Sequence, residues 1–324
     1  MSARGWYQLD KRLTISAVGG NRNRFLARLR EQWPLQVIAL LGVAWLIVFS
    51  YVPLPGIYIA FSDYKVTRGI FGGAFVGLKH FAEFLTDKNL PNVIINTLAI
   101  SGLNLTIGFV MPIIFALLLN ELKNLRYKRV VQTISYLPHF LSWVVLGGFL
   151  ISWTSEYGLI NQLLLQFNLI KTPTYLLSDE QYFWWVALIS QLWKETGWNA
   201  ILFIAAIAGV SQELYESATL DGANRFQKAR YITVPGISST IAILFILQSA
   251  YILSSNFDQI FVLRNTLNAN RSTVLDIYTY RIGIQLGRFS YSTAVGLTKS
   301  VISLLLLLIT NKVSERVTGS TFLR

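Results

Sequence analysis

Long stretches without charge alternate with short polar segments along the whole chain. Four stretches hold no charged residue, and each exceeds the roughly 20 residues that a helix needs to cross a bilayer core. They are residues 32–62, 89–120, 130–155 and 231–257. Two further stretches are apolar with charge in their interior, namely residues 181–212 and 289–311. Buried helices of a large soluble protein would not give six charge-poor runs of this length.

The pattern predicts an all-α membrane protein with six transmembrane helices. We expect these helices over residues 36–61, 93–119, 131–153, 183–209, 238–260 and 290–310. A short helix outside the bilayer is also expected over residues 76–85, because Leu78, Phe81 and Leu85 follow helical spacing.

Composition supports a membrane protein and excludes several kinds of site. Hydrophobic residues make up 53% of the chain and charged residues only 14%, whereas soluble domains carry about a quarter charged residues. The chain has no cysteine and two histidines, so we predict no disulfide and no metal site. No Ser–His–Asp set, HExxH motif or complete phosphate-binding loop occurs, and we expect no catalytic residue in this chain.

Lysine and arginine collect on one side of the predicted bundle. They are concentrated before the first helix, in the loops near 120–130 and 210–237, and after the last helix. By the positive-inside rule these segments face the cytoplasm, so both termini are expected there. We divide the chain into a basic cytoplasmic segment (1–34), a transmembrane domain (35–312) and a cytoplasmic tail (313–324). The formal charge of +12 is then mainly a topology signal, and nucleic-acid binding is not expected.

Two interpretations of the N-terminal segment remain open. Residues 24–31 place Phe25, Leu26 and Leu29 on one helical face among arginines. A helix of this kind can lie on an anionic membrane surface or dock on a partner. An ordinary solvated basic tail explains the same charges. The first apolar run begins near residue 35 and is too long for a cleavable signal peptide.

The loop between the fourth and fifth predicted helices has an unusual sequence, ELYESATLDGANRFQKARYITVP, over residues 213–235. Residues 216–219 favour helix, and Asp221 and Asn224 are residue types that cap helices. Gly222 with its neighbour Ala223 offers a small corner that another protein can approach closely. Such a helix–turn–helix is shaped to enter a groove of a partner protein on the cytoplasmic side.

This loop resembles the EAA loop of binding-protein-dependent ABC importer permeases, whose pattern is Glu-Ala-Ala, three residues, Gly, nine residues, Ile-x-Leu-Pro. The matching residues are Glu216, Ser217, Ala218, Gly222, Ile232, Thr233, Val234 and Pro235. The spacing is intact, and the departures are Ser217 for Ala and Val234 for Leu. Several other segments are similar to the carbohydrate-type permeases, in particular those that import poly- or oligosaccharides, including acidic uronate oligomers such as alginate. They include residues 51–64, 76–84, 132–145 and 256–261.

The resemblance implies that residues 211–236 form a coupling loop, whose helix inserts into a cleft of an ATPase subunit. Carried over, Asp221, Gly222 and Ala223 form the knuckle of this loop, with Glu216 and Arg225 as supporting contacts. The resemblance also implies a heterodimer with a second permease subunit, two ATPase subunits and a periplasmic solute-binding protein at the bacterial inner membrane. ATP and Mg²⁺ would then bind the ATPase subunits, and this chain would hold no cofactor.

Charged residues inside the predicted helices indicate a solute path, since intramembrane charges usually face a bundle interior or a cavity. Lys194 and Lys299 both lie about 15–16 Å below the outer ends of their helices, at 1.5 Å per residue. Equal depth allows an ion pair between Glu195 and Lys299, which would leave Lys194 to bind an anionic sugar. Gln191 and Trp198 share the helical face of Lys194 and complete our predicted pore surface.

Other interpretations of these residues stay open. Asn256 and Asp258 either line the mouth of the path or act as interfacial caps, and the charged set could instead form a structural network or contact the second permease. His139 follows Pro138, and a proline kink is its simpler explanation.

The sequence thus predicts the permease subunit of an ATP-driven importer that moves a saccharide by alternating access. The alternative is a self-sufficient secondary transporter or channel for a small polar solute.

Overall fold

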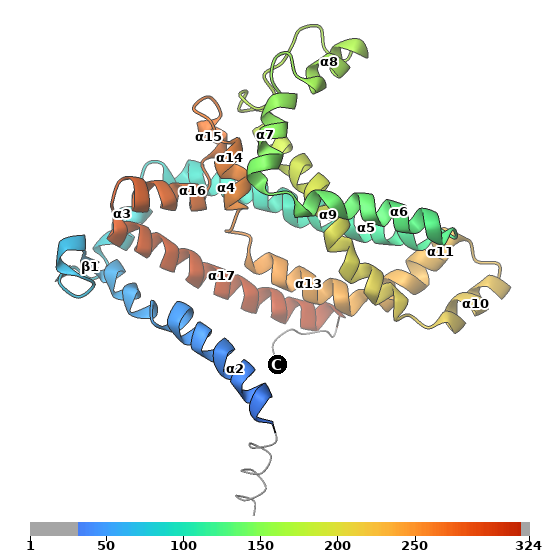
Figure 1. Cartoon of the computed structure of the whole chain (residues 1–324), viewed down its shortest axis with the longest axis horizontal. Coiled ribbons are helices and arrows are strands. Elements are labelled where there is room, and N and C mark those ends of the chain that lie inside the picture. Colours follow the sequence, from blue (N-terminus) through green and yellow to red (C-terminus); the bar gives the residue numbers. More distant parts are fainter. Residues whose placement is uncertain (1–31, 319–324) are drawn as a thin grey trace, which may run out of the picture. The chain divides into compact units, whose positions relative to one another are not determined.

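The computed structural model of the chain describes residues 32–318, and almost all of its regular structure is helical (Figure 1). The chain divides into two compact units at Ile57 and Tyr58. The predicted amphipathic stretch at 24–31 lies outside the described residues, as do most of the predicted 1–34 segment and the end of the tail.

The first unit is one apolar helical segment with exposed side chains. It consists of α2 (Trp33–Leu46), the π-helix η1 (Ile47–Tyr51) and the start of the 3₁₀ helix η2 (Leu54–Phe61). Pro53 and Pro55 explain why the geometry changes here, because proline lacks the N–H that a continuing helix needs. None of the 14 residues of α2 is charged, which suits a helix whose surface meets lipid.

The second unit opens with a small hairpin and a surface helix. Strands β1 (Ser62–Asp63) and β2 (Ala74–Phe75) pair antiparallel around the 3₁₀ turn η3 (Val66–Arg68). Helix α3 (Lys79–Leu85) follows and confirms the short helix predicted at 76–85.

The remaining chain is a helical bundle. Its first half contains α4 (Leu90–Leu103), the π-helix η4 (Asn104–Gly108), α5 (Phe109–Asn120), α6 (Leu125–Tyr136), the 3₁₀ turn η5 (Leu137–Phe140), α7 (Trp143–Trp153), α8 (Leu159–Gln166) and α9 (Phe183–Ala208). Its second half contains α10 (Gln212–Leu220), α11 (Arg225–Lys228), η6 (Ala229–Thr233), α12 (Val234–Gly236), α13 (Ser238–Ala250), α14 (Phe257–Leu263), α15 (Ala269–Ser272), α16 (Leu275–Tyr280), η7 (Arg281–Gln285) and α17 (Phe289–Thr318). Helices α10 and α11 lie at the opposite end of this unit from α3 and β1 (Figure 1).

Three continuous helical segments are long and apolar enough to cross a membrane. They are Trp33–Phe61, Leu90–Asn120 and Phe289–Arg316. Three bent helix pairs raise the number of candidate spans among the described residues to six. The all-helical membrane architecture is therefore confirmed, at three to six spans.

Two of the predicted helices are interrupted, which corrects the sequence prediction. The expected helix at 131–153 bends by 98° between η5 and α7, because Pro138 is followed by the extended residues Leu141 and Ser142. The expected helix at 238–260 stops at Ala250 and resumes only at Phe257. Helix α17 runs beyond the predicted end at 310 to Thr318.

Helix α9 lies at the centre of the packing. One core cluster joins it to α7, α14 and α16 through Leu146, Phe183 and Ile260, all of which are fully buried. A second cluster joins its other end to α5 through Ala116 and Phe203. A third cluster packs α3, α4, α16 and α17 around Tyr291. The long apolar helix α9 thus connects two of the three cores.

Gly197 of α9 permits a close approach to α6. A Cβ at this position would lie 2.2 Å from the backbone oxygen of Ser135. Gly148 of α7 is also helical, but a Cβ there would meet nothing within 4 Å.

We therefore expect Gly197→Ala to destabilise the protein by about 1–3 kcal/mol, the usual cost of overpacking. Gly148→Ala is the matched control and should keep or raise stability, because alanine favours helix over glycine by about 0.5–1 kcal/mol. Thermal unfolding of both variants in detergent checks this, and equal midpoints would contradict the close α6–α9 contact.

Candidate functional site

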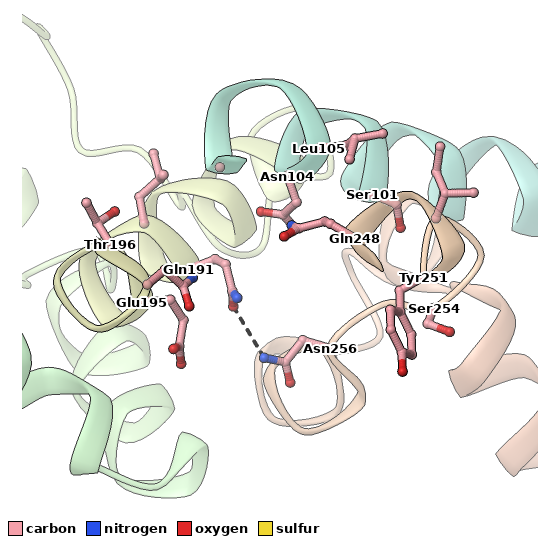
Figure 2. Close-up of a pocket in the computed structure, with 14 residues that line it drawn as sticks. Ser101, Asn104, Leu105, Gln191, Glu195, Thr196, Gln248, Tyr251, Ser254 and Asn256 are labelled. Atoms are coloured by element: carbon pink, nitrogen blue, oxygen red, sulfur yellow. Dashed lines mark hydrogen bonds between the residues drawn. The ribbon is translucent and has the colours of Figure 1, made fainter. Parts of the chain in front are cut away.

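A cavity of about 200 Å³ lies between α4–α5, α9 and the break after α13. Its lining is mostly polar, although it is formed by apolar helices (Figure 2). The lining residues are Ser101, Asn104, Leu105, Gly108, Gln191, Leu192, Glu195, Thr196, Asn199, Gln248, Tyr251, Ile252, Ser254 and Asn256.

A π-helical turn places the first of these polar side chains. Pro112 lies within α5, and its ring excludes the normal hydrogen bond to the carbonyl of Gly108, four residues earlier. The preceding residues form the π-helix η4, which begins at Asn104. π-Turns of this kind recur at functional sites because they re-aim side chains. Here the turn carries Asn104 at the cavity wall.

A break in the helix forms the opposite wall. Residues 251–256 are not helical and contribute Tyr251, Ser254 and Asn256 to the lining. Non-helical backbone at membrane depth is tolerated where it lines a cavity or is buried in protein. This break is held by Asp276, whose carboxylate accepts a hydrogen bond from the backbone N–H of Ser255 and pairs with Lys299.

Helix α9 supplies the third wall. Gln191 Oε1 accepts a hydrogen bond from Asn256 Nδ2 at 3.3 Å across the cavity (Figure 2). Three residues after Asn256, Gln259 Nε2 donates to the carbonyl of Ala187 at 2.6 Å and to Ser190 Oγ at 2.8 Å. These bonds fix α14 against α9 and so position Asn256.

Two buried polar atoms of the cavity wall lack a hydrogen-bond partner among the described residues, namely Ser101 Oγ and Asn104 Oδ1. Buried polar groups nearly always have partners. Ser101 and Asn104 line the cavity, although these two atoms are themselves screened from it.

Lys194 does not face this cavity. It is only 6% exposed, and its ammonium donates to the carbonyls of Pro138, His139 and Leu141 at 3.4, 2.5 and 2.8 Å. These carbonyls belong to the break between α6 and α7, where helical hydrogen bonds end. Lys194 therefore satisfies the backbone of the third predicted span.

The ion pair that equal depth allows between Glu195 and Lys299 does not form. Glu195 instead lies 2.8 Å from His139 Nδ1 and 3.6 Å from Lys194 Nζ, while Lys299 pairs with Asp276. Equal depth along two helices did not bring the groups together, because other partners lie nearer in the folded bundle. Lys194 is thus compensated without a solute.

Trp198 and His139 form a stacked pair beside this network. Their rings are 4.2 Å apart and inclined by only 2°. The kink predicted at Pro138 is present as a full break of the helix, and His139 in addition ties this break to α9. Trp198 therefore contacts the α6–α7 break, and it is absent from the cavity lining.

Three of the seven predicted path residues line the cavity: Gln191, Glu195 and Asn256. Lys194, Trp198 and Lys299 belong to the contacts described above, and Asp258 is exposed in the first turn of α14. The sequence prediction missed Ser101, Asn104, Thr196, Asn199, Gln248, Tyr251 and Ser254. Their signal was uncharged polarity within apolar runs, which a search restricted to charge passes over.

At the other end of the bundle, residues 212–228 form the helix–turn–helix expected from the sequence. Helix α10 ends in a Schellman turn, since Ala223 N donates to Ala218 O at 2.9 Å and Gly222 N donates to Thr219 O at 3.1 Å. Gly222 has φ +77°, a conformation that glycine adopts without strain. Asn224 and Gln227 then begin α11 with a capping box.

Side-chain contacts brace this hairpin and leave its tip open. Lys228 Nζ donates to Thr219 Oγ1 at 2.7 Å, and Arg225 lies 3.6 Å from Glu121. Leu220 and Phe226 flank the tip and are 90% and 72% exposed. A Cβ added at Gly222 would meet nothing within 4 Å. Glu216, Ser217, Asp221 and Pro235 are exposed.

Comparison with known proteins identifies the class. Residues 108–319 match the family described as binding-protein-dependent transport system inner membrane component. The chain is 39% identical over 288 residues to Protein LplB of Bacillus subtilis, covering 89% of this chain and 90% of that protein. It is also 39% identical over 296 residues to the polygalacturonan/rhamnogalacturonan transport system permease protein YteP of the same organism, covering 91% and 92%.

A solved structure agrees in fold. A bacterial alginate ABC transporter, in complex with an alginate pentasaccharide-bound periplasmic protein, contains a chain that matches with a TM-score of 0.82 and 34% identity. The match covers 92% of this chain and 99% of that chain.

The protein therefore belongs to the permeases of binding-protein-dependent ABC transport systems. Within them it is a carbohydrate-importer permease of the inner membrane. It is a non-catalytic subunit without a cofactor of its own, because ATP binds the partner ATPase.

The contacts of Lys194 lead to a prediction for stability. Lys194→Met keeps the length of the side chain but removes the donor to the carbonyls of His139 and Leu141, and each buried acceptor left without a partner costs about 1–3 kcal/mol. The carbonyl of Pro138 keeps its hydrogen bond from the N–H of Leu141. We expect a lower thermal unfolding midpoint and faster proteolysis within residues 137–142. Lys171→Met, at an exposed loop position, should change neither. Unchanged cleavage of Lys194→Met would contradict the role assigned to the ammonium.

Proposed function

We propose that this chain imports an acidic poly- or oligosaccharide, such as an alginate-like oligomer, from periplasm to cytoplasm by alternating access. It would act with a second permease subunit as a heterodimer and with two ATPase subunits. A periplasmic binding protein would deliver the solute. In this arrangement six spans place both termini in the cytoplasm, residues 35–312 form the permease domain, and residues 1–34 and 313–324 are cytoplasmic.

The observation that carries the proposal is the polar cavity bounded by a π-turn and a broken helix. Transporters bind solute near the bilayer midplane where helices are interrupted. The side-chain amides and hydroxyls of the lining can form hydrogen bonds to sugar hydroxyls. Tyr251 adds a flat ring of the kind that packs against a sugar face. Ser101 and Asn104 add a hydroxyl and an amide to the lining.

The acidic character of the solute is supported by the relatives. YteP is named for polygalacturonan and rhamnogalacturonan transport, and the similar solved transporter imports the acidic polysaccharide alginate.

We assign the coupling between ATP hydrolysis and solute movement to residues 211–236. The exposed hydrophobic side chains of Leu220 and Phe226 beside an unobstructed Gly222 suit insertion into a cleft of an ATPase subunit. Asp221 and Ala223 complete the tip, Arg225 braces it through Glu121, and the exposed Glu216 would be a supporting contact to the ATPase subunit. Helix α10 follows α9 after three residues at an angle of 73°, so movement of the hairpin would act directly on a cavity wall.

Removing a polar side chain from the cavity lining should weaken the affinity for solute. Asn104→Ala and Gln248→Ala should each raise the KM for uptake of the acidic oligosaccharide by about three- to tenfold, the effect of one lost hydrogen bond. Uptake is measured with the complete transporter and its binding protein in proteoliposomes. Gln166→Ala, an exposed amide outside the cavity, is the control. A KM unchanged in both cavity variants would contradict the assignment of this cavity.

Adding a side chain at the tip of the hairpin should weaken the coupling to the ATPase subunit. Asparagine tolerates positive φ, so Gly222→Asn adds a side chain without forcing the turn to change. We expect the transporter to lose most of its solute-stimulated ATP hydrolysis because the added side chain obstructs docking. Gly287→Asn is the matched control, since Gly287 has φ +69° with nothing within 4 Å of an added Cβ. Normal stimulation in Gly222→Asn would argue for a transporter that works without this contact.

A further inference from the structure

A second cavity of about 410 Å³ shares no lining residue with the first one and lies at the end of the bundle where α3 packs. It is formed by the start of α4, by α15, α16 and η7, and by the residue that ends α14. Two arginines face it, Arg264 and Arg281, together with Asn92, Asn270, Tyr278 and Gln285. No aspartate or glutamate is among the described residues that line it.

The charge of these arginines is not compensated by the described part of the chain. Neither Arg264 nor Arg281 forms an ion pair there, and the buried Nε of Arg264 has no hydrogen-bond partner. Burial and the nearby charge of Arg281 lower the pKa of Arg264. By contrast, Arg288 at the same end pairs with Glu83, and Arg271 stacks on Trp184. Arg264 is partly buried and Arg281 is exposed, so the cost of leaving a guanidinium without an anion falls mainly on Arg264.

The wall around the arginines is held rigid by amide contacts. Asn92 Nδ2 donates to the carbonyl and to the side-chain oxygen of Asn270, at 2.8 and 3.0 Å. Asn96 Nδ2 donates to the carbonyls of Asn270 and Thr273. The hydroxyl of Tyr278 is bonded to Asp87 and Tyr291. The carboxylate of Asp87 is therefore already bonded to Tyr278 and Tyr291. These contacts hold the cavity in shape before any ligand enters.

We propose that this cavity binds the carboxylate of an acidic saccharide, with Arg264 and Arg281 as the donors. The inference rests on the proposed function, and it assigns a binding site to the charged group of the saccharide. Guanidinium groups suit carboxylates because they can donate two parallel hydrogen bonds. Lys194, the cation that the sequence suggested for this role, is occupied by three carbonyls and cannot serve.

Helix α14 connects this cavity to the first one. Its N-cap, Asn256, lines the smaller cavity, and its C-cap, Arg264, lines the larger one. Seven helical residues span about 10 Å, so a single oligosaccharide is long enough to contact both ends. The smaller cavity would then hold neutral hydroxyls and the larger one a uronate carboxylate.

The test uses two probes, trigalacturonate and its carboxyl-reduced neutral trimer. Their affinities are measured by thermophoresis on the complete transporter, with its partner subunits, in nanodiscs without binding protein. The wild type should bind the acidic trimer more tightly. Arg264→Gln and Arg281→Gln should each weaken its binding about tenfold, as expected for a lost charged hydrogen bond, and leave the neutral trimer unaffected. Arg281 is exposed, so its variant keeps the test valid if Arg264→Gln fails to fold.

Arg68→Gln is the matched control, because Arg68 is exposed in η3 and does not line the cavity. It should leave the affinity for both trimers unchanged. Equal affinity of the wild type for the two trimers would overturn the proposal. So would an arginine effect seen only in phosphatidylglycerol nanodiscs, which would assign the cavity to a lipid headgroup. An effect that requires the added binding protein would assign the arginines to a protein carboxylate instead.

ATP-driven uptake of both trimers into proteoliposomes distinguishes a failure of the proposed function from a failure of the carboxylate site alone. If the wild type takes up neither trimer, the proposed function itself fails. If it takes up both without preference for charge and without an effect of the arginine variants, only the carboxylate site fails.

Discussion

Backbone polar groups freed at helix breaks must be satisfied inside the molecule, because lipid offers no donors or acceptors. This constraint explains the placement of the charged side chains. Lys194 donates to the carbonyls freed between α6 and α7. Asp276, paired with Lys299, accepts the N–H of Ser255 at the break after α13. Lys194 and Asp276 are therefore used to stabilise irregular backbone segments.

The breaks in turn create the cavity. A continuous fifth helix would place its carbonyls and N–H groups in its own hydrogen-bond ladder and present apolar side chains to α9. The interruption at 251–256 instead brings Tyr251 and Asn256 opposite Gln191. Helix α9 contacts both breaks and leads into α10, so one rigid element connects the cavity with the proposed ATPase contact.

The two cavities differ in the way their polar groups are satisfied. In the smaller one the acid Glu195 is already balanced by Lys194 and His139, which leaves neutral amides and hydroxyls at its surface. In the larger one, two arginines lack a counter-charge among the described residues. A solute with hydroxyls and carboxylates matches this division, and the short helix α14 sets the distance between the two environments.

The sequence by itself determined the membrane class, the positions of most helices, the surface helix α3 and the hairpin around Gly222. These follow from local chemistry: apolar run length, helical spacing, capping residues and a glycine at positive φ. It also marked Gln191, Glu195 and Asn256. Only the tertiary structure decided the partners of Lys194, Glu195 and Lys299, the break at 251–256 and the convergence of Arg264 with Arg281. Pairing in a bundle depends on the rotation and bending of helices far apart in the chain, which depth along a single helix does not encode.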